Sequence, residues 1–121
     1  MGKLTTHVLD TASGKPAAGM TVELSVWEEQ RQGSGWSKLK TLQTNAGGRT
    51  DEPLLEGSAF KAGQYRLTFD VSSYYRKLGT VLANPPFLDR VPLRFGIADP
   101  GEHCHVPLLC TPWGYTTYKG S

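Results

Sequence analysis

The sequence predicts an all-β sandwich built from short strands, with one short helix. Three observations support this fold class. Runs of strand-forming residues recur between clusters of Gly, Pro, Asn and Asp. Residues 20–27 and 64–70 alternate between apolar and polar side chains, which is typical of strands with one buried face. Only residues 71–82 could form a helix, and a chain of 121 residues fits a single domain, 1–121, with a modest core.

The first half of the chain predicts three strands. Residues 4–10 form the first strand, and a turn-rich segment at 11–16 closes it. Residues 20–27 form the second strand. Because residues 28–35 are polar and contain glycine, we expect a long loop there, followed by a partner strand at 36–44.

A turn at residues 45–48 then brings Arg49 to the start of a short run at 50–55. In the strand at 64–70 the apolar residues Tyr65, Leu67 and Phe69 face one way.

In the second half, a helix over 71–82 would have Ser72 or Ser73 as its N-cap and Gly79 near its end. Pro85 and Pro86 break the chain after it. The remaining expected elements are strands at 87–97, 103–111 and 115–119, with turns at 99–101 and 112–114.

Composition excludes some classes of protein. Thirteen basic and eleven acidic residues are spread along the chain and give a net charge of +2, so we expect no nucleic-acid partner. No segment approaches the roughly 18 apolar residues of a membrane span, and the N-terminus lacks an apolar signal region. Cys104 and Cys110 lie six residues apart on one expected strand, roughly 20 Å, which is too far for a disulfide. Two reduced thiols favour the cytoplasm.

The chain contains three histidines, His7, His103 and His105. Strand alternation places His7 on one face with Thr5 and Leu9. A strand histidine is more often structural than catalytic. His105, however, lies in a strongly apolar strand, where desolvation lowers the pKa of an imidazole and suits it to act as a base near pH 7.

Two other interpretations concern the charged residues. Arg49 follows two glycines and can present its guanidinium at the start of a strand, although a surface ion pair with Asp51 or Glu52 is the simpler interpretation. His103, His105 and His7 could chelate zinc. Because no carboxylate or thiolate lies at a position that must join them, we predict no metal site.

Both ends of the chain resemble the transthyretin-related 5-hydroxyisourate hydrolases. The residues that carry the resemblance are Leu4-Thr5-Thr6-His7-Val8-Leu9-Asp10 with Gly14-Lys15-Pro16-Ala17, Asn45, Gly48-Arg49, Pro53-Leu54-Leu55, Pro86-Phe87-Leu88, His103-Cys104-His105-Val106-Pro107-Leu108-Leu109, Pro112 and Gly114-Tyr115-Thr116-Thr117-Tyr118-Lys119-Gly120-Ser121. The resemblance covers nearly the whole chain.

The resemblance implies a transthyretin-like sandwich of two four-stranded sheets and a homotetramer with active sites between its dimers. It implies hydrolysis of 5-hydroxyisourate to 2-oxo-4-hydroxy-4-carboxy-5-ureidoimidazoline, without metal or cofactor. By matching position, His7 and His105 would be the catalytic histidines and Arg49 the substrate-binding arginine. Tyr118 and Ser121 would line the same cavity, with His103 in a supporting role. Either histidine could be the general base.

One position departs from the family pattern. Lys119 stands where the family usually has arginine, and we expect this lysine to act in interface or terminal packing rather than on substrate. Two other functions remain open, a transthyretin-type carrier of a small hydrophobic ligand and a plain β-sandwich interaction module. Convergence of His7, Arg49 and His105 in space would favour the enzyme.

Overall fold

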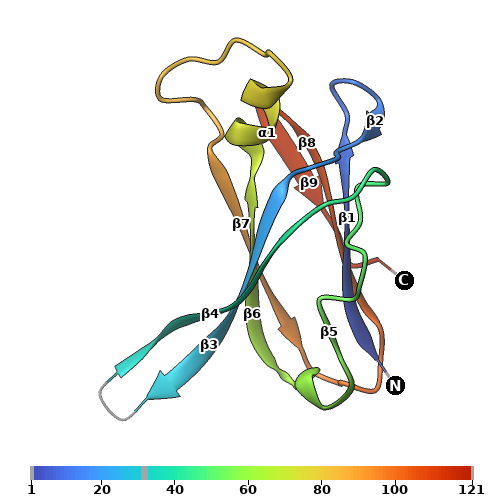
Figure 1. Ribbon diagram of the computed structural model, residues 1–121. Helices are drawn as coiled ribbons and strands as arrows, with labels where there is room; N and C mark the ends of the chain where they lie inside the picture. Colours follow the sequence, from blue (N-terminus) through green and yellow to red (C-terminus); the bar gives the residue numbers. More distant parts are fainter. Residues whose placement is uncertain (1, 31–32, 121) are drawn as a thin grey trace.

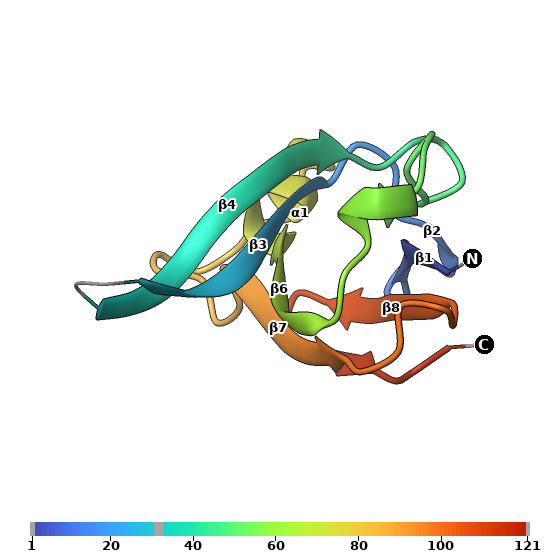
Figure 2. The ribbon, with the colours of Figure 1, turned by 90° about the horizontal axis from the view of Figure 1, so that it is seen from below.

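The computed structural model describes residues 2–30 and 33–120, which form two β-sheets packed face to face (Figure 1). One sheet has the strand order β2-β1-β8-β9, with β5 also paired to β1, and the other has the order β4-β3-β6-β7. Figure 2 shows the two layers from below. Fold class and short helix are therefore confirmed.

The elements have the following bounds. The first sheet contains β1 (Lys3–Asp10), β2 (Lys15–Pro16), β5 (Leu55–Glu56), β8 (Cys104–Thr111) and β9 (Gly114–Thr117). The second sheet contains β3 (Thr21–Gln30), β4 (Gly33–Gln43), β6 (Gly63–Asp70) and β7 (Arg90–Ile97). A 3-10 turn (Gly57–Ala59) precedes β6, and the helix α1 (Val71–Lys77) follows it.

The core lies between the sheets and is built from alternate residues of each strand. In β1, burial alternates along the whole strand, so that Leu4 and Val8 are fully buried while His7 points away from the core. The other fully buried apolar side chains include Val22, Leu24, Leu67, Phe69 and Leu108. The predicted faces of the strands at 4–10, 20–27 and 64–70 are confirmed.

Parallel pairing of β1 with β8 determines where the two ends of the chain meet. The register runs from Leu4 opposite Cys104 to Asp10 opposite Cys110. The N-terminal and C-terminal strands, which are about a hundred residues apart in sequence, therefore lie side by side at the centre of their sheet. This pairing brings the histidines of the two segments onto one sheet.

A buried carboxylate ties helix α1 to this sheet. Asp10 is 1% exposed and accepts hydrogen bonds from the hydroxyls of Tyr74 (2.9 Å) and Tyr75 (2.7 Å) and from the backbone amide of Ser13 (3.2 Å). Burial alone would raise the pKa of Asp10, but the hydrogen bonds from Tyr75, Tyr74 and Ser13 outweigh it and lower the pKa. The ionised carboxylate is thus a structural joint between the helix and β1.

The prediction of a loop at residues 28–35 is wrong for the residues of this segment that the structure describes, 28–30 and 33–35. Strand β3 continues to Gln30 and β4 begins at Gly33, and the hairpin projects beyond the rest of its sheet (Figure 1). Trp27 and Trp36 face each other across this hairpin with ring centroids 5.3 Å apart. Aromatic packing extends the ladder into a segment that composition alone marks as a loop.

The predicted helix was too long and its predicted cap was wrong. Helix α1 ends at Lys77, and Gly79 adopts a φ of +87° just beyond it. The N-cap is Asp70, whose carboxylate accepts from the amide of Ser73.

Two predicted strands also have different bounds. The strand expected at 87–97 begins only at Arg90, and the strand expected at 115–119 ends at Thr117. Beyond Thr117 the chain leaves the ladder and returns to β8 at a single bridge, between Gly120 and His105.

Two further predictions concern the cysteines and membrane-spanning segments. Both cysteines are buried free thiols, as predicted. The described residues contain no helix with the length and hydrophobicity needed to cross a bilayer.

Candidate active site

His7 and Arg49 meet at the edge of β1. Between the short pairings of β1 with β5 and with β2, His7 forms an isolated antiparallel bridge with Arg49. Beside it, the amide of Val8 donates to the carbonyl of Gly48 at 2.8 Å. The loop that ends at Arg49 is therefore fastened to β1 by its backbone.

The side chain of Asn45 builds this loop. Its Oδ1 accepts hydrogen bonds from the amides of Gly47 (2.9 Å) and Arg49 (3.1 Å). Gly48 has a φ of +75°, and a Cβ there would lie 2.4 Å from the carbonyl oxygen of Val8, so only glycine fits. The loop points the carbonyl of Gly47 at His7, whose Nε2 donates to it at 3.0 Å.

His105 is held from the neighbouring strand. Thr5 lies directly opposite it in the parallel register, and the threonine hydroxyl is 2.8 Å from Nδ1 of the imidazole. His7, two residues further along β1, is the diagonal neighbour of His105. Strand spacing and rise put their Cα atoms about 8 Å apart.

The C-terminal segment closes the other side of His105. The amide of Gly120 donates to the carbonyl of His105 at 2.8 Å. A Cβ at position 120 would lie 2.6 Å from Cδ2 of the imidazole, so the bare backbone of Gly120 packs against the ring. The glycine of the terminal Tyr-x-Gly-Ser sequence is explained by this close approach.

Electrostatics keeps both imidazoles neutral at pH 7. Partial burial lowers the pKa of His7, and the nearby charge of Arg49 lowers it further, while the hydrogen bond to Gly47 opposes them. Partial burial also lowers the pKa of His105, and the nearby charge of Arg49 lowers it further, as a proton on His7 would. The pKa of His105 was expected to fall through desolvation, and this is confirmed.

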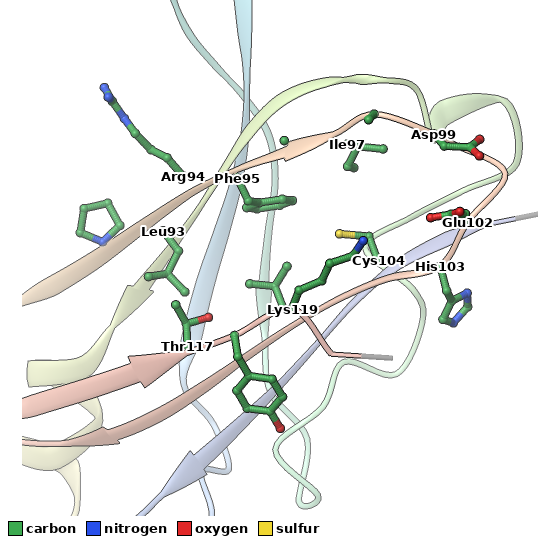
Figure 3. A pocket seen from close by; sticks show the side chains of 15 residues that line it. Leu93, Arg94, Phe95, Ile97, Asp99, Glu102, His103, Cys104, Thr117 and Lys119 are labelled. Carbon is green, nitrogen blue, oxygen red and sulfur yellow. The ribbon is translucent and has the colours of Figure 1, made fainter.

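A cavity of about 470 Å³ lies between β7 and the C-terminal part of the first sheet. Tyr118, Lys119 and His103 line it, and Figure 3 shows Lys119 reaching toward Cys104. Burial raises the pKa of the Cys104 thiol, and the charge of Lys119 opposes this. His7, Arg49 and His105 do not line this cavity.

The structure thus brings together three of the predicted residues, His7, Arg49 and His105, on one sheet. The described residues contain no ion pair between Arg49 and either Asp51 or Glu52, so the simpler interpretation of Arg49 is not supported.

Two other predicted residues, Tyr118 and His103, line the cavity, and Ser121 lies outside the described residues. No group of three or more His, Cys, Asp or Glu side chains suited to a metal ion occurs in the described ranges.

Two residues that hold the site, Thr5 and Asn45, have no predicted role in it. Thr5 was placed on the His7 face, but its contact with His105 depends on the register of two distant strands. Asn45 was assigned to a turn. An Asn followed by two glycines could have signalled a side-chain-tethered loop.

A two-sheet sandwich whose first and last long strands together present two neutral imidazoles beside a guanidinium defines a transthyretin-like protein with a candidate hydrolytic site. The family model described as "HIUase/Transthyretin family" matches residues 4–120. The chain belongs to this family.

Known relatives agree with this assignment. The chain is 54% identical over 120 residues to a 5-hydroxyisourate hydrolase of Mesorhizobium japonicum, a match that covers 99% of this chain and 93% of the relative. Among solved structures it resembles 5-hydroxyisourate hydrolase of Klebsiella pneumoniae (TM-score 0.76, 32% identity, all of both chains). It also resembles an (S)-allantoin synthase (TM-score 0.91, 43% identity), covering 99% of this chain but only 44% of that one.

Proposed function

We propose that this protein is an enzyme that hydrolyses 5-hydroxyisourate, the product of urate oxidation, to 2-oxo-4-hydroxy-4-carboxy-5-ureidoimidazoline. The observation that carries the proposal is the convergence of His7, Arg49 and His105 on one sheet, where one backbone bridge joins His7 to Arg49 and another joins His105 to Gly120. Full-length identity of about half to hydrolases of this substrate supports it. A carrier or a plain interaction module has no need of this arrangement.

The imidazoles supply the base for water attack. Each is tied to the protein through one nitrogen, Nε2 of His7 to Gly47 and Nδ1 of His105 to Thr5. Nδ1 of His7 and Nε2 of His105 make no hydrogen bond to the described residues. When neutral, His7 has a lone pair on Nδ1, and His105 has one on Nε2 when Thr5 accepts from its Nδ1. A water bound at either nitrogen can lose a proton to it as it attacks the substrate carbonyl.

Arg49 acts on the charge that this attack creates. Addition of hydroxide to a ring amide carbonyl places negative charge on the oxygen, and a nearby guanidinium stabilises that oxyanion. When the intermediate collapses, the ring C–N bond breaks, the proton taken from water passes to the leaving nitrogen, and the carboxylic acid that forms loses its own proton to solvent and becomes a carboxylate. The balance of atoms requires only water, so no metal or cofactor enters the proposal.

The remaining predicted residues keep secondary roles. We assign Tyr118 and Ser121 to substrate binding and His103 to a supporting role. The 58% exposure of the Tyr118 side chain fits a residue that meets a ligand or another subunit.

A homotetramer with active sites between its dimers is proposed for the assembly. Strands β7 and β9 are the edges of their sheets, and edge strands present unpaired backbone groups that a second copy can continue. Trp113 (67% exposed) lies in the turn between β8 and β9, Tyr115 (45% exposed) lies on β9, and both suit a surface that another subunit covers. Light scattering on the purified protein tests this, and a monomeric mass at micromolar concentration would contradict it.

The chain as a whole is proposed to be one domain, supported by the match of a single family model to residues 4–120. Its proposed location is the cytoplasm, which the two free thiols favour.

The decisive experiment follows the ultraviolet absorbance of 5-hydroxyisourate generated with urate oxidase. We expect the protein to accelerate the decay, and His105→Ala and Arg49→Gln each to remove most of the acceleration. Arg76→Gln on helix α1 is the matched control for loss of one arginine and should leave the rate unchanged. A decay no faster than the spontaneous one would leave a ligand carrier as the better interpretation.

A further inference from the structure

The outer face of the second sheet carries cations away from the proposed active site. The strand register places Lys38, Ser25, Arg66 and Arg94 in one row across β4, β3, β6 and β7. Arg90 lies near one end of β7. In Figure 3 the side chain of Arg94 points away from the interior cavity, which agrees with its outward position. We call the surface formed by Arg66, Arg90 and Arg94 the arginine face.

Arg66 and Arg94 occupy an arrangement that is unfavourable by itself. They are directly opposite each other in the β6–β7 register, and like charges at such positions repel. Both guanidinium groups lie over the ring of Trp36, at 4.7 Å and 5.4 Å from its centroid. Trp27 supports this ring from the side. The aromatic ring offsets part of the repulsion and holds both cations in place.

No carboxylate neutralises these two cations. Within the described ranges no acidic group lies within ion-pair distance of Arg66 or Arg94, whereas Arg90 pairs with Glu23 at 2.5 Å. Nε of Arg66 is shielded from solvent and has no hydrogen-bond partner in the described structure. Arg66 and Arg94 therefore carry two positive charges without an acidic ion-pair partner among the described residues.

A hollow of about 230 Å³ opens at this face. Its walls are Glu23, Arg66, Thr68, Arg90 and Pro92. The volume is below the roughly 300–1,000 Å³ of pockets for drug-sized ligands. It has room for a compact anion with some of its waters. The planar donors of a guanidinium match the oxygens of phosphate and carboxylate groups.

We propose that the arginine face binds a compact oxyanion through Arg66, which lines the hollow, and through Arg94, which lies opposite Arg66 in the β6–β7 register but does not line the hollow, with the hydroxyl of Thr68 as a further donor. Glu23 does not repel such a ligand strongly, since its charge is matched by Arg90. The two uncompensated charges favour a dianion, so phosphate should bind more tightly than a monocarboxylate. This site lies on the other sheet from His7 and His105 and is independent of the proposed hydrolysis.

The test titrates inorganic phosphate into the full-length protein at constant ionic strength, with chloride as the balancing anion. Tryptophan fluorescence reports on the site through Trp36, and calorimetry gives the affinity. We expect saturable binding that Arg66→Gln weakens at least about tenfold, a loss equal to about 1.4 kcal/mol. Lys3→Gln, on β1 of the other sheet, changes the net charge equally and should bind phosphate like the wild type. Acetate, titrated in parallel, should bind more weakly.

Several results would overturn the proposal. These are a linear, non-saturating response to phosphate, an equal response to chloride, or equal weakening by Arg66→Gln and Lys3→Gln. Acetate binding as tightly as phosphate, with the same loss in Arg66→Gln, would support the oxyanion site and identify a carboxylate as its ligand. Thermal unfolding shows whether each variant folds. If Arg66→Gln does not, Arg94→Gln takes its place with the same expected loss, because Arg94 is exposed and its replacement leaves no buried gap.

Discussion

Replacing Gly120 with alanine should disable the site while leaving the fold intact. The new Cβ would lie 2.6 Å from Cδ2 of His105 and 3.2 Å from its Cβ and Cγ. Ordinary carbon contacts begin near 3.4 Å, so either the imidazole or the terminal segment must move by about 0.8 Å. Movement of the ring lengthens its contact with Thr5, and movement of the segment weakens the hydrogen bond from Gly120 to the His105 carbonyl.

The magnitude follows from the displacement. A misplacement of roughly 1 Å in a catalytic group typically costs about 10²-fold in rate, which corresponds to about 2.7 kcal/mol of transition-state stabilisation. We therefore expect kcat/KM for Gly120→Ala to fall about a hundredfold in the absorbance assay. The free energy of unfolding should change by no more than the roughly 1–3 kcal/mol of an overpacked contact.

Gly114→Ala is the matched control. It lies in β9 of the same sheet, and its Cβ would meet only the hydroxyl of Thr111, at an ordinary 3.9 Å. This variant should keep wild-type activity. Wild-type activity in Gly120→Ala, or an equal loss in both variants, would refute the reasoning that the terminal glycine exists to let the backbone pack on the imidazole.

Three further predictions follow from the same geometry. Partial burial and the charge of Arg49 lower the pKa values of His7 and His105, so activity should persist below pH 6.5. In Arg49→Gln this charge is absent, and the acid limb of the pH profile of the residual activity should move to higher pH. An acid limb at the same pH in both proteins would rule out this charge effect. Asn45→Ala should release the loop that carries Arg49 and lower kcat/KM about tenfold with little change in melting temperature, and a normal rate would show that the loop holds its shape without this side chain. Asp10→Asn should lower the free energy of unfolding by about 2–4 kcal/mol in urea titrations, because the tyrosine hydroxyls lose an ionised acceptor. The pKa of Asp10 in the folded protein lies below the unfolded value of 3.8, so the carboxylate contributes its full stabilisation above that pH and loses it as the pH falls through the folded pKa. The stability of the variant should lack this dependence on pH.

Local periodicity predicted the strands well because it reports burial directly. The alternation of β1 placed His7 outside the core, and the structure has the same pattern. It failed in the hairpin, where Trp27 and Trp36 support a ladder through polar residues that on their own indicate a loop. A cross-strand contact of this kind has no signature within either strand. The predicted end of the last strand was also wrong, because a single bridge between Gly120 and His105 replaces regular strand pairing there.

The candidate site was less accessible to local reasoning, since its geometry depends on long-range register. The residues alone left His7 and His105 as separate strand histidines and left Arg49 closer to a surface ion pair. The resemblance to the family assigned His7, His105 and Arg49 to one site, but it did not show which contacts fix each side chain in place. Parallel pairing of β1 with β8, about a hundred residues apart, explains the contact between Thr5 and His105.

The site can be understood as a place where the regular sheet stops on both sides. Along the middle of β1, neither β2 nor β5 continues the ladder, and the gap is filled by the loop that carries Arg49. Along β8, pairing with β9 ends at Leu108, and Gly120 alone returns opposite His105. Continuous strands at these edges would impose regular cross-strand neighbours on both histidines. Irregular segments instead supply a guanidinium on one side and bare backbone on the other, while β1 and β8 keep the imidazoles fixed between them. The paired strands β1 and β8 thus position the two imidazoles, and the irregular segments at their edges contribute the guanidinium of Arg49 and the backbone of Gly120.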